Sequence, residues 1–145
     1  MKKAFMFLKS YIIILRVKKI LKTKGLQVSI RKLLWPCSRK HSSRGKLPNA
    51  TDFAVKHIED VIDSACHWQL SPTLCVPRAI TAYVLLSDNG FEPILNVGVK
   101  TEPLVAHAWV AVDGKSVADS YPEDDKQKLK LLLQYPERIG TETTL

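Results

Sequence analysis

The chain has 145 residues, of which 46% are hydrophobic and 25% charged, so it is long enough for one hydrophobic core and too short for two ordinary domains. This composition excludes an intrinsically disordered chain. The net charge of +8 is unevenly distributed. Residues 1–46 hold 14 Lys or Arg and no Asp or Glu, whereas residues 47–145 hold 8 basic and 14 acidic residues. We therefore divide the chain into a basic helical N-terminal region with a linker, residues 1–46, and a folded domain, residues 47–145.

The basic N-terminal region is predicted to begin with a helix over residues 3–22. Gly25, which follows two lysines, is typical of a helix C-terminus. A second short helix is expected over residues 26–34, and the polar segment 36–50 is predicted to be a linker or loop. The apolar side chains of the first helix are expected to form one broad stripe: Phe5, Leu8, Ile12, Ile13, Leu15, Val17, Ile20 and Leu21.

The first helix does not have the pattern of a membrane span or a signal peptide. Its longest uninterrupted apolar run covers residues 11–15, far below the roughly 20 residues that cross a bilayer. Lys9 and Arg16 interrupt any signal-peptide core, and no clear cleavage site follows. We expect neither a membrane span nor a signal peptide.

Two helices are predicted in the first half of the folded domain. Asn49 or Thr51 can cap a helix over residues 52–65, in which apolar residues recur at helical spacing. Residues 71–73 are a turn and a side-chain cap signal, which predicts the start of a second helix at Leu74 or Cys75. This helix tolerates a proline in its first turn and ends before the turn at residues 88–90.

Alternating apolar residues then predict strands over residues 94–99, 106–112 and 115–119. The pair Asp113-Gly114 is a strong hairpin signal between the last two strands. Residues 123–133 are compatible with either a charged helix or a strand. The expected fold class is α+β, with a helix packed on a small antiparallel sheet.

Three residues at the edges of predicted elements carry the chemistry of this chain. Cys75 begins a helix, where unpaired N–H groups and the positive end of the helix dipole stabilise a thiolate. His107 lies on a strand, and pairing of Val112 with Lys115 across the hairpin brings Asp119 to the level of His107. A thiol, a base and a carboxylate that orients the base are the parts of a cysteine nucleophile. We therefore predict a catalytic triad of Cys75, His107 and Asp119.

The alternative is that these residues are packing residues, since a lone cysteine on an apolar helix usually lies in the core. The joint placement of all three favours a site. We interpret the other cysteines and histidines, and Asp113, as structural, solvated or turn residues. The odd cysteine count favours a reducing cytosol, and no ligand cluster predicts a metal or cofactor. The other cysteines and histidines are Cys37, Cys66, His41, His57 and His67.

Residues 68–119 resemble the transglutaminase-core-like domain of lasso-peptide B proteins, which are leader peptidases. The blocks agree in order and spacing, and their combination is far more specific than any single block. They are Cys75-Val76-Pro77-Arg78-Ala79, Leu85-Leu86, Gly90, Val97-Gly98-Val99-Lys100, His107-Ala108-Trp109-Val110, Val112-Asp113-Gly114 and Asp119.

The resemblance implies a papain-like cysteine peptidase fold for residues 47–145. It implies Cys75 as nucleophile, His107 as base and Asp119 as orienting acid, with the backbone N–H of Cys75 as oxyanion donor. Gln69 lies where some papain-like enzymes use a glutamine. The implied reaction removes the leader from a ribosomally made lasso-peptide precursor in a bacterial cytoplasm, before a synthetase closes the macrolactam.

Two features depart from that family. Ala111 stands where the family commonly has an acidic residue. Residues 1–46 are too short and too helical for the leader-recognition domain of the fused members, so the resemblance implies a stand-alone peptidase that uses a separate leader-binding protein.

The basic N-terminal region admits three interpretations. Its helix can pack on the core and contact the partner or leader, it can lie on an anionic membrane as a peripheral contact, or it can bind nucleic acid. No recognised module supports nucleic-acid binding. Two functional alternatives to the peptidase stay open: an acyl transferase using the same triad, and a non-catalytic basic scaffold or membrane-associated protein.

Overall fold

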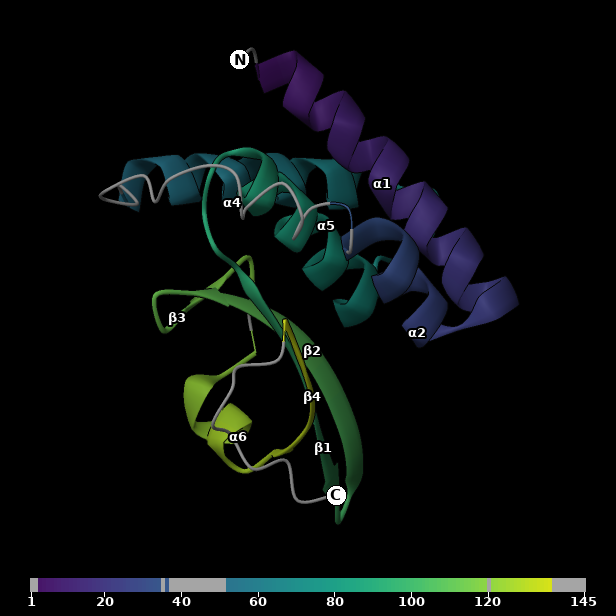
Figure 1. Cartoon of the computed structure of the whole chain (residues 1–145), viewed down its shortest axis with the longest axis vertical. Helices are drawn as coiled ribbons and strands as arrows, with labels where there is room; N and C mark the ends of the chain where they lie inside the picture. Colours follow the sequence, from purple (N-terminus) through teal and green to yellow (C-terminus); the bar gives the residue numbers. More distant parts are fainter. Residues whose placement is uncertain (1–2, 35, 37–51, 120, 137–145) are drawn as a thin grey trace.

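The computed structural model describes residues 3–34, 36, 52–119 and 121–136. Its long helices are α1 (Lys3–Lys24), α4 (Asp52–His67) and α5 (Cys75–Asp88), and its short ones are α2 (Leu26–Ser29), the π-helix η1 (Ile30–Leu34) and α6 (Glu123–Gln127). The strands are β1 (Ile94–Thr101), β2 (Leu104–Val112), β3 (Lys115–Val117) and β4 (Lys130–Tyr135). Figure 1 shows the long helices on one side of the molecule and the sheet on the other. The predicted α+β class is confirmed.

The sheet is antiparallel with strand order β3-β2-β1-β4. The Asp113-Gly114 turn pairs Val112 with Lys115, as the sequence predicted. Both turn residues have positive φ, 51° and 82°, which matches the tight hairpin turns that favour such residues. The third strand is shorter than predicted, because Ala118 adopts φ 54° and turns the chain out of the sheet. Residues 123–133, left open between helix and strand, contain α6 and the start of β4.

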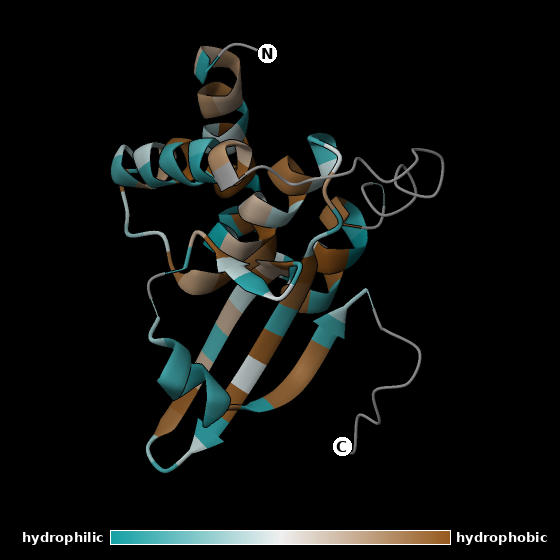
Figure 2. Cartoon of the chain, turned by 90° about the vertical axis from the view of Figure 1, so that its left-hand side faces the viewer, coloured by the Kyte–Doolittle hydropathy of each residue, from teal (hydrophilic) through white to brown (hydrophobic). Residues whose placement is uncertain are grey.

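Helix α5 is the centre of the core. One side of α5 contacts the helices α1 and α4, and the other side contacts strand β2 of the sheet. Ten of its fourteen residues are buried, and Tyr83, Ile80 and Leu86 are almost completely enclosed. On β2, Ala108, Val110 and Val112 are buried while their neighbours are half-buried, so one face of the sheet supports the helices. Figure 2 shows this as hydrophobic bands on the strands and in the helices near them.

The prediction of one broad apolar stripe on α1 was wrong. Met6, Ile13, Ile14 and Val17 are buried together with Ser10, whereas Phe5, Leu8, Ile12 and Leu15 are about half exposed. The physical reason is that the helix has more apolar residues than one face can hold, so two opposite faces are apolar. Only one of them packs on α4 and α5 among the described residues.

The other sequence predictions of helices are close to the structure. Helix α1 ends at Lys24, directly before Gly25 with φ 86°. The expected side-chain cap on α5 is absent, because its N-cap is Leu74, which makes no side-chain hydrogen bond. The expected caps Asn49 and Thr51, and the linker apart from Pro36, lie outside the described residues. No helix of the described residues is long and apolar enough to cross a bilayer.

Gly98 on β1 provides a test of this packing. A Cβ at this position would lie 2.9 Å from Cβ of Leu129 and 3.3 Å from the Trp109 ring. We predict that Gly98→Ala lowers the free energy of unfolding by about 1–3 kcal/mol, because the neighbours must shift. Urea unfolding measures this change. Thr101→Ala, on the exposed end of the same strand, is the control and should change stability by less than about 0.5 kcal/mol.

Candidate active site

Cys75 is the first residue of α5 and has a free thiol. The nearby N–H of Arg78 bonds the carbonyl oxygen of Leu74 at 3.3 Å, so the helix begins at the cysteine. The half-buried thiol faces a cavity of about 230 Å³. The same cavity is lined by both other residues of the predicted triad, His107 and Asp119.

The cavity lies at an open edge of the sheet. Residues of β2 from both faces line it, with His107 and Trp109 on one face and Ala108 and Val110 on the other. Because β3 pairs only with Val110–Val112, the edge of β2 beside His107 is left uncovered by β3. The start of α5 and His107 therefore line one cavity at this edge, although most of α5 packs on the opposite face of the sheet.

His107 is positioned by a carboxylate and by aromatic rings. Its Nε2 lies 2.9 Å from Oδ1 of Asp119, and its side chain is 13% exposed. The imidazole stacks on Tyr121 with ring centroids 4.4 Å apart, and lies nearly parallel to the Trp109 ring at 5.9 Å. A carboxylate oxygen can only accept a hydrogen bond, so Nε2 carries the proton and Nδ1 keeps the free lone pair.

Asp119 reaches His107 because of the hairpin register. Val117 pairs with Val110, and Asp119 follows Val117 by two residues. The carboxyl group of Asp119 therefore lies at the level of His107, as predicted. Its Oδ1 also accepts the backbone N–H of Tyr121 at 3.1 Å. Its Oδ2 lies 2.9 Å from Nζ of Lys126. The described structure contains no hydrogen bond between Cys75 and His107, a contact that is often long without substrate and tightens in the complex.

Lys126 on α6 is a component of the site that the sequence did not predict. It is 6% exposed, and Nζ donates to Oγ of Ser116 at 2.7 Å and to Oε2 of Glu123 at 2.9 Å in addition to pairing with Asp119. Burial alone lowers the pKa of Lys126, but its bonds to Asp119 and Glu123 outweigh burial and raise this pKa above 10.5. Only the fold brings α6 to Asp119, so no local sequence signal marks this lysine.

Ala118, which precedes the acid, is held in its unusual conformation from both sides. Its N–H donates to Oε1 of Glu59 on α4 at 2.9 Å, and its carbonyl accepts Nε of Arg78 on α5 at 2.6 Å. Arg78 also forms an ion pair with Asp63. A non-glycine residue at φ 54° is strained, and these two bonds offset that cost. The direction in which Asp119 leaves the sheet is therefore fixed by two helices.

The remaining candidate residues that the structure describes do not line the cavity of the triad. Gln69 is not among the residues that line the cavity, and Cys66 is half-buried on α4, where burial raises the pKa of its thiol against the lowering effect of Arg78. His57 and His67 belong to α4, and His67 packs edge-on against Trp68. Ala111 pairs with Ser116 within the sheet. Cys37 and His41 lie outside the described residues.

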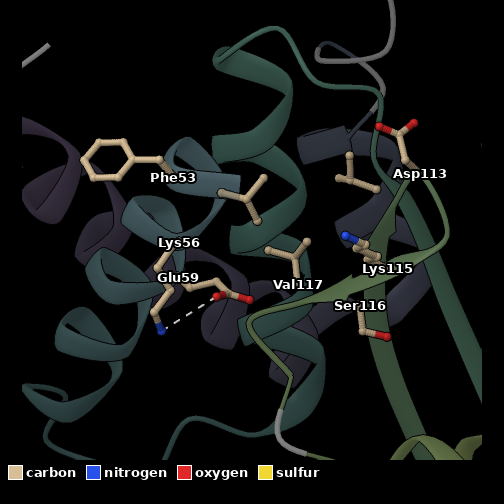
Figure 3. Close-up of a pocket in the computed structure, with 9 residues that line it drawn as sticks. Phe53, Lys56, Glu59, Asp113, Lys115, Ser116 and Val117 are labelled. Carbon is tan, nitrogen blue, oxygen red and sulfur yellow. Dashed lines mark ion pairs between the residues drawn. The ribbon is translucent and has the colours of Figure 1, made fainter. Parts of the chain in front are cut away.

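A larger hollow of about 670 Å³ lies between α4 and the β2–β3 hairpin. Figure 3 shows Phe53, Lys56 and Glu59 of α4 on one side of it, and Val117, Lys115 and Ser116 of β3 on the other. None of the triad residues lines the larger hollow, so we assign the chemistry to the smaller cavity, which all three line. Val117 lines both spaces, which makes them neighbours. Among the described residues, no cluster of three or more metal-binding side chains is present.

A thiol at a helix N-terminus, facing one cavity with a His–Asp pair on an antiparallel sheet, defines a site of the papain and transglutaminase kind. Comparison with known families agrees: the model of the transglutaminase-like superfamily matches residues 12–134. The chain belongs to this superfamily, whose enzymes are of the cysteine-protease or acyltransferase type. No curated protein and no solved structure gives a significant match. The match begins inside α1, and the predicted division at residue 46 stays a prediction.

The ion pairs of Lys126 predict a pH dependence of stability. Because the folded pKa of Lys126 is above 10.5, its stabilising contribution is complete below about pH 10.5 and is lost as pH rises through the folded pKa. At neutral pH, Lys126→Met should lower the free energy of unfolding by about 3 kcal/mol, because it leaves buried Asp119 without its cation. Urea unfolding at several pH values measures both effects.

The difference in stability between wild type and Lys126→Met should shrink as the pH rises above that value. Lys128→Met is the matched control, since Lys128 makes only an exposed ion pair with Asp125. If the difference in free energy of unfolding between wild type and Lys126→Met stayed constant up to strongly alkaline pH, this would contradict a raised pKa of Lys126.

Proposed function

We propose that this protein is a cysteine peptidase that removes the leader from a ribosomally made lasso-peptide precursor. The observation that carries the proposal is the placement of Cys75 on the cavity that also holds the His107–Asp119 pair. The superfamily match supports the type of chemistry. The motif blocks over residues 68–119 support the substrate, a leader peptide rather than any protein.

The proposed reaction has two stages. Nδ1 of His107 takes the thiol proton of Cys75, and the thiolate attacks the carbonyl carbon of the scissile bond. The backbone N–H of Cys75 stabilises the oxyanion, the C–N bond breaks, and His107 protonates the leaving amine. His107 then takes a proton from water, which attacks the thioester carbonyl carbon. The C–S bond breaks, and His107 returns the proton to the Cys75 thiolate, which restores the enzyme. Asp119 holds His107 in the required tautomer throughout.

The proposal includes the partners that the resemblance implies. A separate leader-binding protein presents the precursor, and a macrolactam synthetase uses the amine released by cleavage. The proposed setting is a bacterial cytoplasm.

The superfamily also favours a second candidate, an acyl transferase on the same triad. In that case an amine, rather than water, accepts the acyl group from the Cys75 thioester. The two reactions differ only in the second stage. They are distinguished by adding a small primary amine and searching for its incorporation into the product by mass spectrometry.

Cleavage of a lasso-peptide precursor tests the proposal. Precursor, leader-binding protein and either wild type or Cys75→Ala are incubated, and the products are analysed by mass spectrometry. We predict one cut at the leader–core boundary by wild type, and at least an approximately thousandfold lower rate with Cys75→Ala. Cys66→Ala is the matched control and should cut at nearly the wild-type rate. If neither protein cuts while both fold and the leader is bound, a non-catalytic scaffold is the better account.

A further inference from the structure

Helix α1 presents an apolar surface to solvent, which we call the outer stripe: Phe5, Leu8, Ile12 and Leu15. The exposed fractions of these side chains are 54%, 56%, 48% and 48%, in that order. They recur at helical spacing over about 15 Å of the helix axis. Figure 1 shows α1 along the outer side of the helical layer. Four large apolar side chains in one row are an unusual surface for a protein that stays in water.

The charges around the outer stripe all have one sign. Helix α1 has no acidic residue in its first turn and ends in Lys22 and Lys24, and residues 1–46 contain no Asp or Glu at all. Lys9 and Lys18 bond side chains or backbone of other parts of the chain, Asp88 and Ser71. The exposed basic residues of α1 are Lys3, Arg16, Lys19, Lys22 and Lys24. Of these, Arg16, Lys19 and Lys22 lie at helical spacing on the side of the outer stripe.

The basic residues continue beyond the end of α1. Arg31 and Lys32 on η1 are exposed, and the pKa of Lys32 is lowered mainly by the neighbouring charge of Lys24, with Arg16 also contributing. These cations therefore lie close enough to repel one another. An anionic surface placed against them relieves this repulsion, while the outer stripe supplies apolar contact.

We propose that the outer stripe and its basic flank dock this protein on the surface of an anionic lipid bilayer. The helix lies along the interface with Phe5, Leu8, Ile12 and Leu15 among the upper acyl chains, and its exposed lysines and arginine meet the lipid phosphates. A short row of apolar residues bordered by cations on a single protruding helix fits the shallow apolar layer of a bilayer. Docking uses none of the triad residues, so it is independent of the proposed reaction.

Vesicle co-sedimentation of the full chain tests this proposal. Vesicles of phosphatidylcholine alone are compared with vesicles that also contain phosphatidylglycerol, at low and high salt. We expect binding to the anionic vesicles only, weakened by salt. We expect the double substitution Leu8→Ser and Ile12→Ser to reduce the partition coefficient by at least about tenfold. Leu104→Ser is the matched control, because Leu104 is an exposed leucine on β2, outside α1, and should not change binding.

Two results would overturn membrane docking. One is wild type that stays in solution with anionic vesicles. The other is equal sedimentation of wild type and the double variant. A wild-type protein that ignores vesicles, but forms a dimer broken by the same double substitution, would assign the outer stripe to a protein interface instead. Circular dichroism confirms that each variant is folded, and changing exposed side chains should not prevent folding.

A different observation concerns Lys126. Its charge is buried and its Nζ pairs with the triad carboxylate on the oxygen that His107 does not use. Ser116 and Glu123 hold the ammonium group in place. We infer that Lys126 is a positioning residue: it fixes the rotation of the Asp119 carboxylate, so that Oδ1 keeps the proton on Nε2 of His107. This inference rests on the proposed function.

Nuclear magnetic resonance of the His107 ring tests this role without any substrate. In wild type we expect the Nε2-protonated tautomer, with a proton that exchanges slowly with water. Lys126→Gln should mix the tautomers and make the exchange fast, whereas Lys126→Arg, which keeps a cation, should restore the wild-type signal. A wild-type signal in folded Lys126→Gln, or its loss in folded Lys126→Arg, would overturn the inference. The precursor assay with the same proteins separates this outcome from failure of the peptidase proposal, which would appear as no cleavage by wild type.

Discussion

The site depends on how the carboxylate of Asp119 is held. One oxygen bonds Nε2 of His107 and the backbone N–H of Tyr121, and the other pairs with Lys126. Each bond comes from a different part of the chain, so the carboxylate has a single orientation. That orientation determines which nitrogen of His107 is free to act as a base. A buried carboxylate with one missing partner would be both unstable and able to rotate.

Ala118, the residue before Asp119, links the helices to the sheet. Ala118 is bonded by Glu59 on α4 and Arg78 on α5, and Arg78 lies one helical turn after Cys75. The nucleophile and the acid are therefore connected through one side chain. Movement of the start of α5 would change the position of the chain that carries Asp119. The larger hollow beside β3 borders this connection through Glu59, which lines the hollow and bonds Ala118.

Local signals predicted much of this arrangement. The Asp113-Gly114 turn determined the register that places Asp119 beside His107, since a two-residue hairpin allows one pairing. The contact of Lys126 with Asp119 depends on how α6 folds back, and the pairing of β4 with β1 joins segments far apart in sequence. Apolar periodicity also did not reveal which face of α1 packs, because both faces are apolar. The spacing of apolar residues predicts local helices and strands. Tertiary contacts determine which face of a helix packs and which strands become neighbours in the sheet.

The central claim is that Cys75, His107 and Asp119 act as one unit, and the alkylation rate of Cys75 tests it most directly. Iodoacetamide labelling is followed by mass spectrometry of the cysteine peptides in wild type and His107→Ala. Cys66 is an internal reference, because burial raises the pKa of its thiol. We predict that Cys75 reacts much faster than Cys66 in wild type and loses most of this advantage in His107→Ala. Equal rates for Cys75 in the two proteins would contradict the account.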